Sequence, residues 1–359
     1  MMHEQTFLRR WLGELPIYGL ALALFALCAA LLSQHGVYPS MSPMLVNLRL
    51  FMAAIISVLV IDIVVFLATK RPDSPITAIK SRYFSANARQ RMVACVPLLA
   101  VCIMLLPFFS KMKAAIPLFN DYTWDATFIA WDRAIFFGYD AWEVMQPVLG
   151  FPIVTATLAV FYHLWMLLLY PGCLFFSFAK IDPVLRRQFF MTYVLSWTVV
   201  GGAMATWMAS VGPCFVGPML GNETFDAQMA YLNAANEQVP VMTLKVQVML
   251  LDWFYQSANG LGSGITAMPS MHIAICFLFW MAMRQVDRRL GHAFAAFLVI
   301  IWIGSVHLAY HYAVDGLVSA VAVAAIWWIS GNAIRAWDAW LARSNTAPLS
   351  LAPNAAPAE

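Results

Sequence analysis

The sequence predicts an all-α polytopic integral membrane protein, a helix bundle with about eight transmembrane spans. Its 359 residues are 62% hydrophobic and only 11% charged, whereas a soluble domain carries about 25% charged residues. Long apolar runs recur along the chain, and a helix needs about 20 such residues to cross a bilayer. The predicted spans are 16–33, 48–68, 92–110, 152–178, 189–209, 269–284, 291–310 and 315–334.

The basic residues predict the orientation of this bundle. If the N-terminus is cytoplasmic, all but five of the 21 Lys and Arg residues fall in cytoplasmic segments, as the positive-inside rule requires. The five on the other side are Arg49, Lys111, Lys113, Arg133 and Lys245. Both termini are therefore expected in the cytoplasm, at the inner membrane if the host is a bacterium. The basic residues form no stripe of the kind that binds nucleic acid, so no such partner is predicted.

Three regions are predicted along the chain. Residues 1–90 form an N-terminal two-span region, 91–335 a transmembrane catalytic core, and 336–359 a cytoplasmic, largely disordered tail, since its last residues are rich in Ala, Pro, Ser and Asn. Two loops on the non-cytoplasmic side, roughly 111–151 and 210–268, are long enough to contain small helices. The first of these loops is expected to include an amphipathic helix that lies on the membrane surface.

The motif Pro269-Ser270-Met271-His272 marks the start of the sixth predicted span. Proline is favoured in the first turn of a helix and serine is a good N-cap, and the apolar run 273–283 continues the helix. His272 is therefore expected in the first turn. A helix N-terminus presents free N–H groups and a partial positive charge, which suits a phosphate group.

A second motif pairs His311 with Asp315. The chain turns at 284–289 and returns through the seventh span, whose roughly 20 residues cover about 30 Å. His311 is thereby delivered to the membrane face that His272 occupies. Residues four apart share a helix face, so Asp315 is expected to hold the His311 ring in one tautomer and to leave the other nitrogen as a nucleophile.

Two other interpretations of these residues are open. An interfacial histidine can be an amphipathic anchor and an aspartate at a helix start can be a cap, although ionisable residues at membrane depth favour a function. The i, i+4, i+8 spacing of His307, His311 and Asp315 would allow a divalent-metal site on a continuous helix. That stripe crosses the junction of two predicted spans, and it leaves the Pro-Ser-Met-His motif without a role. No metal or cofactor is therefore predicted.

These motifs resemble those of the type-2 phosphatidic acid phosphatase superfamily. The second motif of that superfamily, Pro-Ser-x-His, is matched by Pro269, Ser270 and His272, and its third motif ends in His-x-x-x-Asp, matched by His311 and Asp315. The surrounding residues are most similar to the branch that contains inositol phosphorylceramide synthases, which are inositolphosphotransferases, with sphingomyelin synthases as cousins. A stretch in the first long loop, Asp125 to Asp132, is more loosely similar to that branch.

The resemblance implies a six-helix phosphatase-like catalytic core, compatible with residues 90–335, and a phospho-histidine mechanism. His311 would attack phosphorus while Asp315 orients and stabilises it. His272 would protonate the departing alkoxide and then deprotonate the acceptor. Ser270 would help to bind the phosphate.

Some cationic residues of the phosphatase branch are missing. That branch has a first motif, Lys-x6-Arg-Pro, and an Arg six residues before the nucleophile, where this sequence has Ser305. The only Lys-x6-Arg is Lys180 to Arg187, which lacks the proline and lies on the predicted cytoplasmic side. A phosphomonoester dianion profits from several cations, whereas a phosphodiester carries a single charge. The sequence therefore favours a diester substrate.

Phosphate binding is assigned to Lys245, Arg133 and His307, together with the helix N-terminus. The predicted function is a membrane lipid phosphotransferase that moves a phosphorylated headgroup from a phospholipid to a lipid or other alcohol, on the periplasmic or outer face. The alternative is hydrolysis, with water as the acceptor, of a lipid phosphate or of a polyprenyl diphosphate. A transporter-like protein that keeps the scaffold without the chemistry is a further alternative.

Overall fold

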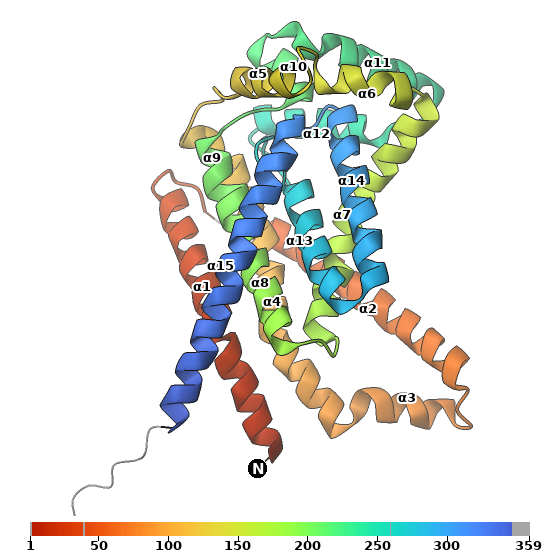
Figure 1. Cartoon of the computed structure of the whole chain (residues 1–359), viewed down its shortest axis with the longest axis vertical. Coiled ribbons are helices and arrows are strands. Elements are labelled where there is room, and N and C mark those ends of the chain that lie inside the picture. The colour runs from red at the N-terminus through yellow and green to blue at the C-terminus, as the bar shows by residue number, and fades with distance from the viewer. Residues whose placement is uncertain (1, 39, 259, 347–359) are drawn as a thin grey trace, which may run out of the picture.

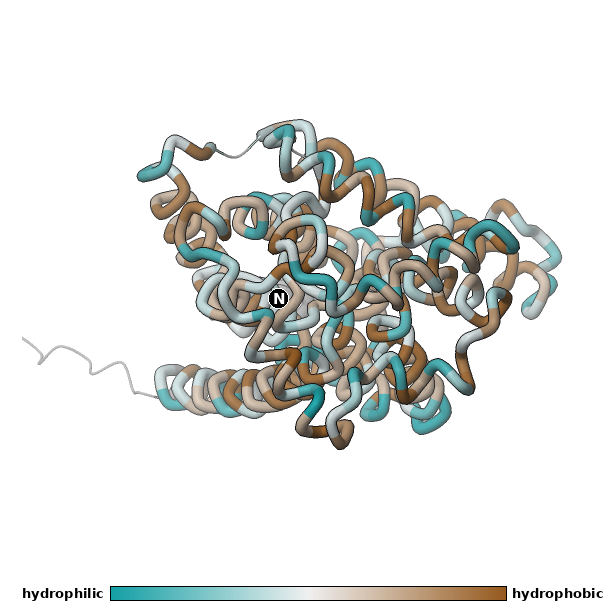
Figure 2. The backbone as a smooth tube through the Cα atoms, turned by 90° about the horizontal axis from the view of Figure 1, so that it is seen from above, coloured by the Kyte–Doolittle hydropathy of each residue, from teal (hydrophilic) through white to brown (hydrophobic). Residues whose placement is uncertain are grey.

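The structure is a computed structural model that describes residues 2–38, 40–258 and 260–346, and every regular element within these ranges is helical. The helices form an upright bundle with a layer of short helices across one end (Figure 1). Most residues along the chain are apolar, and hydrophilic stretches are short (Figure 2). The predicted fold class, an all-α polytopic membrane protein, is confirmed.

Among the described residues, seven helical segments are long and apolar enough to cross a membrane. Their helices are α1 (Met2–Ser33), α2 (Met41–Lys70), α4 (Ala86–Ala114), α7 (Pro152–Phe178), α8 (Pro183–Leu195) with its continuation, α14 (Arg288–His307) and α15 (Ala313–Thr346). The remaining predicted span is α13 (Met271–Val286), whose 16 residues rise about 24 Å. All eight predicted segments are thus helices, and one is shorter than a usual span.

The two predicted long loops fold into the layer at the upper end of the bundle in Figure 1. The first loop contributes η1 (Ile116–Leu118), α5 (Asp125–Ile135) and α6 (Ala141–Leu149), and the second contributes α10 (Pro213–Leu220), η3 (Glu223–Phe225), α11 (Asp226–Gln238) and α12 (Met242–Tyr255). The expectation of small helices in these loops is confirmed. We call this layer the cap. It lies over the start of α13 and over the turn between α14 and α15 (Figure 1).

The fifth span is not a regular α-helix throughout. Beyond α8, residues Ser196–Met204 form the π-helical segment η2, which continues into α9 (Ala205–Trp207). Close packing requires glycine in this segment, because a Cβ on Gly201 would lie 2.6 Å from the Phe109 ring and 2.8 Å from the Met271 sulfur. Through these contacts η2 joins the end of α4 to the start of α13.

The end of the bundle opposite the cap carries α3 (Pro75–Phe84) and the lower part of α15 (Figure 1). There the Arg187 guanidinium forms two hydrogen bonds with Asp338, of 2.6 and 2.7 Å, so the Lys-x6-Arg segment is far from the cap. Helix α15 continues to Thr346, well past the predicted end of the core at 335. The rest of the predicted tail, 347–359, lies outside the described residues.

Candidate functional site

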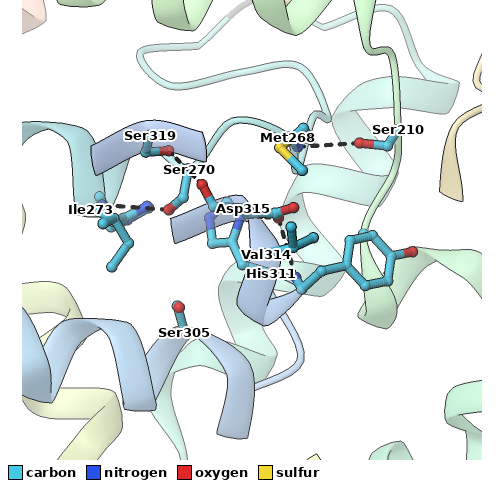
Figure 3. A network of polar contacts seen from close by, with 12 residues as sticks. Ser210, Met268, Ser270, Ile273, Ser305, His311, Val314, Asp315 and Ser319 are labelled. Atoms are coloured by element: carbon cyan, nitrogen blue, oxygen red, sulfur yellow. Dashed lines mark hydrogen bonds and ion pairs between the residues drawn. The ribbon is translucent and has the colours of Figure 1, made fainter. Parts of the chain in front are cut away.

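The Pro-Ser-Met-His motif forms the start of α13, as the sequence predicts. Ser270 is the N-cap, and its Oγ accepts a hydrogen bond of 3.4 Å from the Ile273 N–H (Figure 3). His272 lies in the first turn. The segment before the helix is fixed by Ser210, whose Oγ accepts from the Met268 N–H at 3.1 Å. This helix N-terminus therefore has a defined position under the cap.

The predicted pairing of His311 with Asp315 is present. His311 Nδ1 lies 3.0 Å from Asp315 Oδ2 (Figure 3). The same oxygen accepts a hydrogen bond from the Tyr312 N–H at 3.1 Å. Asp315 is completely buried and His311 is 6% exposed. Because α14 ends at His307 and α15 begins at Ala313, the pair is held by a turn that leads into α15 and not by one continuous helix.

These contacts determine which nitrogen of His311 is available for chemistry. Asp315 Oδ2 already accepts the Tyr312 N–H, so the proton between this oxygen and the ring is assigned to His311 Nδ1 and the lone pair to Nε2. Burial, together with the positive charge of Lys113, lowers the pKa of His311 to about 3. The ring is therefore neutral at neutral pH, which is the state that a nitrogen nucleophile needs.

His272 faces His311 across the site, with 5.8 Å between the ring centroids. Tyr162 stacks on the His272 ring at 4.1 Å, and its hydroxyl lies 3.0 Å from Nδ1. Trp165 packs at 4.2 Å from the same ring. The aromatic side chains of α7 thus enclose His272 and leave its Nε2 as the nitrogen available to a substrate. This role of α7 was not predictable from the sequence, since hydrophobic patterns do not distinguish such aromatics from core residues.

Two carboxylates of α5 hold the turn that carries His311. Asp132 accepts from the Ala313 and Val314 N–H groups at 2.7 and 2.9 Å. Asp125 accepts from the Tyr312 hydroxyl at 2.7 Å and from the Gly212 N–H at 2.9 Å. Burial raises the pKa of Asp132 to about 6 and also raises that of Asp125. We call these contacts of Asp125 and Asp132 the clamp. The only sequence signal for the clamp was the loose similarity of the stretch between these two aspartates to the inositol phosphorylceramide synthase branch.

The cap also satisfies the end of α14. The Gln228 side chain of α11 donates to the Val306 carbonyl at 2.8 Å, and that of Gln247 on α12 donates to the Leu308 carbonyl at 2.9 Å. The Ser305 carbonyl accepts from the His311 N–H at 3.2 Å. Carbonyls at a helix end need such partners, and here they fix the backbone immediately before the nucleophile candidate.

The three side chains assigned to phosphate binding lie in different surroundings. His307 is buried, with Nε2 2.8 Å from the Thr155 hydroxyl and its ring beside Tyr231. Arg133 pairs in a bidentate manner with Asp140, at 2.8 and 3.0 Å. Lys245 is exposed on α12. The contacts described for them do not include the two motif histidines, so their assignment to phosphate binding stays a prediction without support from these contacts.

The side chains proposed as metal ligands point in different directions. His307 turns to Thr155, while His311 turns to Asp315 on the far side of the helix break. Within the described ranges no group of three or more His, Cys, Asp or Glu side chains has the arrangement of a metal site. The residues proposed as ligands from their spacing are therefore not brought together as a set.

The sequence model of the PAP2 superfamily matches residues 126–329. This range contains both motifs and most of the cap, and it begins after α4. No curated protein and no solved structure was found to match the chain.

Proposed function

The chain belongs to the PAP2 superfamily, and from that premise we propose that it is a lipid phosphotransferase that acts through a phospho-histidine on His311. Membership suggests phosphatase or phosphotransferase chemistry on lipid-like substrates. The observation that carries the proposal is the opposed pair of histidines, 5.8 Å apart, with Asp315 on the far nitrogen of His311. A phosphorus atom between them would have a nucleophile on one side and a proton donor on the other.

In the first step, His311 Nε2 attacks phosphorus and the bond from phosphorus to the oxygen of the departing lipid alcohol breaks. His272 enters this step as an imidazolium, and the proton on its Nε2 passes to that oxygen, so diacylglycerol leaves as a neutral alcohol and the His272 ring becomes neutral. In the second step, His272 takes the proton of an acceptor hydroxyl as its oxygen attacks phosphorus. The bond from phosphorus to nitrogen then breaks, and both histidines return to their initial protonation states.

The enclosure of the site favours an alcohol over water as the acceptor. His311 is 6% exposed, Ser270 is completely buried, and the His272 ring is packed between Tyr162 and Trp165. A closed apolar site excludes bulk water and limits hydrolysis of a reactive intermediate. On this basis and on the motif residues, we assign the chain to the branch that contains inositol phosphorylceramide synthases.

The proposal also places the site on one face of a membrane. Both motifs lie at the cap end of the bundle, whereas the N-terminus lies at the opposite end (Figure 1). The excess of Lys and Arg in the segments at that opposite end supports a cytoplasmic location for the termini. The cap would then face the periplasm if the host is a bacterium.

The first test is release of diacylglycerol from acyl-labelled phosphatidylinositol, phosphatidylglycerol and phosphatidate by the purified full-length protein, with ceramide or another alcohol present or absent. His311→Ala is compared with His292→Ala, which removes an exposed histidine of α14. Release from a diester that requires both the acceptor and His311 supports the transferase. Release from phosphatidate without an acceptor supports the phosphatase, and equal activity of the two variants refutes the role of His311.

A further inference from the structure

Lys113 lies in the last turn of α4, beside the segment that leads into α13. Its Nζ is 3.5 Å from the Gly262 carbonyl. The same segment is fixed to α4 by the Ser110 hydroxyl, which accepts from the Gly262 N–H at 2.8 Å. Lys113 precedes residue 126, so it lies outside the range matched by the superfamily model. The sequence predicts that Lys113 lies on the non-cytoplasmic side, but nothing in the sequence connects it to the histidines.

The backbone brings this lysine close to the nucleophile candidate. Gly264 packs on the Lys113–Ala114 peptide so closely that a Cβ at this glycine would lie 2.6 Å from the Lys113 carbonyl carbon. Three residues later, the backbone of Ala267 contacts the His311 ring. Three residues span at most about 11 Å even when fully extended. The Lys113 backbone and the His311 ring are therefore connected by one short stretch of chain, residues 264–267.

The present contact of Lys113 leaves its charge available. An ammonium has three donors, and a neutral carbonyl at 3.5 Å is at the outer limit of a hydrogen bond. The charge is already felt in the site, because it contributes to lowering the pKa of His311. By comparison, the guanidinium of Arg133 is occupied by the Asp140 carboxylate.

We propose that Lys113 is the cation that binds the substrate phosphate, together with the N-terminus of α13. When a substrate enters, the ammonium exchanges the Gly262 carbonyl for a phosphate oxygen. One lysine and one helix N-terminus match the single negative charge of a phosphodiester better than the two charges of a phosphomonoester. This inference rests on the proposed function and specifies its substrate class as a monoanionic phosphodiester.

The matched variants are Lys113→Met and Lys111→Met. Lys111 lies on the same turn but lines a separate apolar groove with Leu32, Met44 and Phe108. Loss of a charge-assisted hydrogen bond predicts that Lys113→Met lowers kcat/KM for phosphatidylglycerol about 10- to 100-fold, while Lys111→Met changes it less than about twofold. Lys113→Arg keeps the charge and restores part of the activity. Equal kcat/KM values for Lys113→Met and Lys111→Met overturn the inference.

The substrate class is tested with the same proteins. The wild type is expected to prefer phosphatidylglycerol to phosphatidate, and a clear preference for phosphatidate overturns the diester assignment. A binding measurement separates this inference from the proposed function. If no lipid is turned over, thermal unfolding with inorganic phosphate still reports on Lys113. Stabilisation of the wild type and of Lys111→Met, but not of Lys113→Met, supports the anion site, and equal stabilisation of all three overturns it.

Discussion

The clamp between Asp132 and the start of α15 gives the sharpest test of how the nucleophile is positioned. Both oxygens of Asp132 accept backbone N–H groups, from Ala313 and Val314, directly after the turn that carries His311. We predict that Asp132→Asn keeps the fold but slows the reaction. The amide retains one acceptor oxygen and presents an NH2 group to the other N–H.

The magnitude follows from two opposing effects. Burial raises the pKa of Asp132 from 3.8 to about 6, so keeping it ionised in the folded protein at neutral pH costs about 3 kcal/mol. Asparagine removes this cost but leaves one buried N–H without an acceptor, at about 1–3 kcal/mol. The net change in the free energy of unfolding is therefore within about 2 kcal/mol of zero. Displacing the turn by about 1 Å would still lower kcat by about 10- to 100-fold.

The assay measures kcat and the thermal unfolding midpoint of Asp132→Asn in detergent at pH 7.5. Asp121→Asn is the control, because Asp121 is an exposed aspartate of the same loop and its loss should change neither quantity. A wild-type kcat in Asp132→Asn would refute the argument that this carboxylate positions His311. A large drop in the unfolding midpoint together with kcat would instead show that the clamp is needed for folding.

Two further predictions concern the segment before α13 and the pH dependence of stability. Gly264→Ala should abolish most activity and lower the unfolding midpoint, because its φ is +91° and a Cβ would lie 2.5 Å from the Ala114 nitrogen. Gly262→Ala is the control: its φ is +85°, but a Cβ would meet nothing within 4 Å, so the free energy of unfolding should fall by only about 1 kcal/mol. The pKa of His311, about 3, is below the ordinary value of 6.5, so the contribution of this histidine to stability is complete above pH 6.5 and is lost as pH falls toward 3. Between pH 7 and 4 the unfolding midpoint should therefore decline less in His311→Gln than in the wild type. Parallel declines in the two proteins would contradict this prediction.

The sequence predicted those parts of the structure that depend on local patterns. Apolar length located every spanning helix, and the proline and serine before Met271 located the start of α13. The spacing of His311 and Asp315 predicted their hydrogen bond, although a turn rather than a continuous helix provides it. These features are set by residues within a few positions of one another, which is the range over which helix caps and turns are encoded.

The supports of the site were not predictable in this way. Asp132 acts on backbone N–H groups of residues 313 and 314, and a backbone donor has no signature in the sequence. Arg133, next to it, was assigned to phosphate binding from its charge, yet its guanidinium pairs with Asp140. Composition shows which charges a loop contains, but the direction of each side chain follows from how the cap helices pack.

The N-terminus of the short helix α13 lies beneath the cap (Figure 1). Helices α13 and α14 adjoin at residue 287, and they contain 16 and 20 residues. At 1.5 Å per residue α13 is about 6 Å shorter than α14, and Ser270 at its N-terminus is completely buried. The buried backbone groups beside it, at the end of α14 and the start of α15, cannot rely on water for hydrogen bonds. The carboxylates of α5 and the amides of Gln228 and Gln247 supply these bonds, and they leave the N-terminus of α13 as the place where an anionic headgroup gains most from binding.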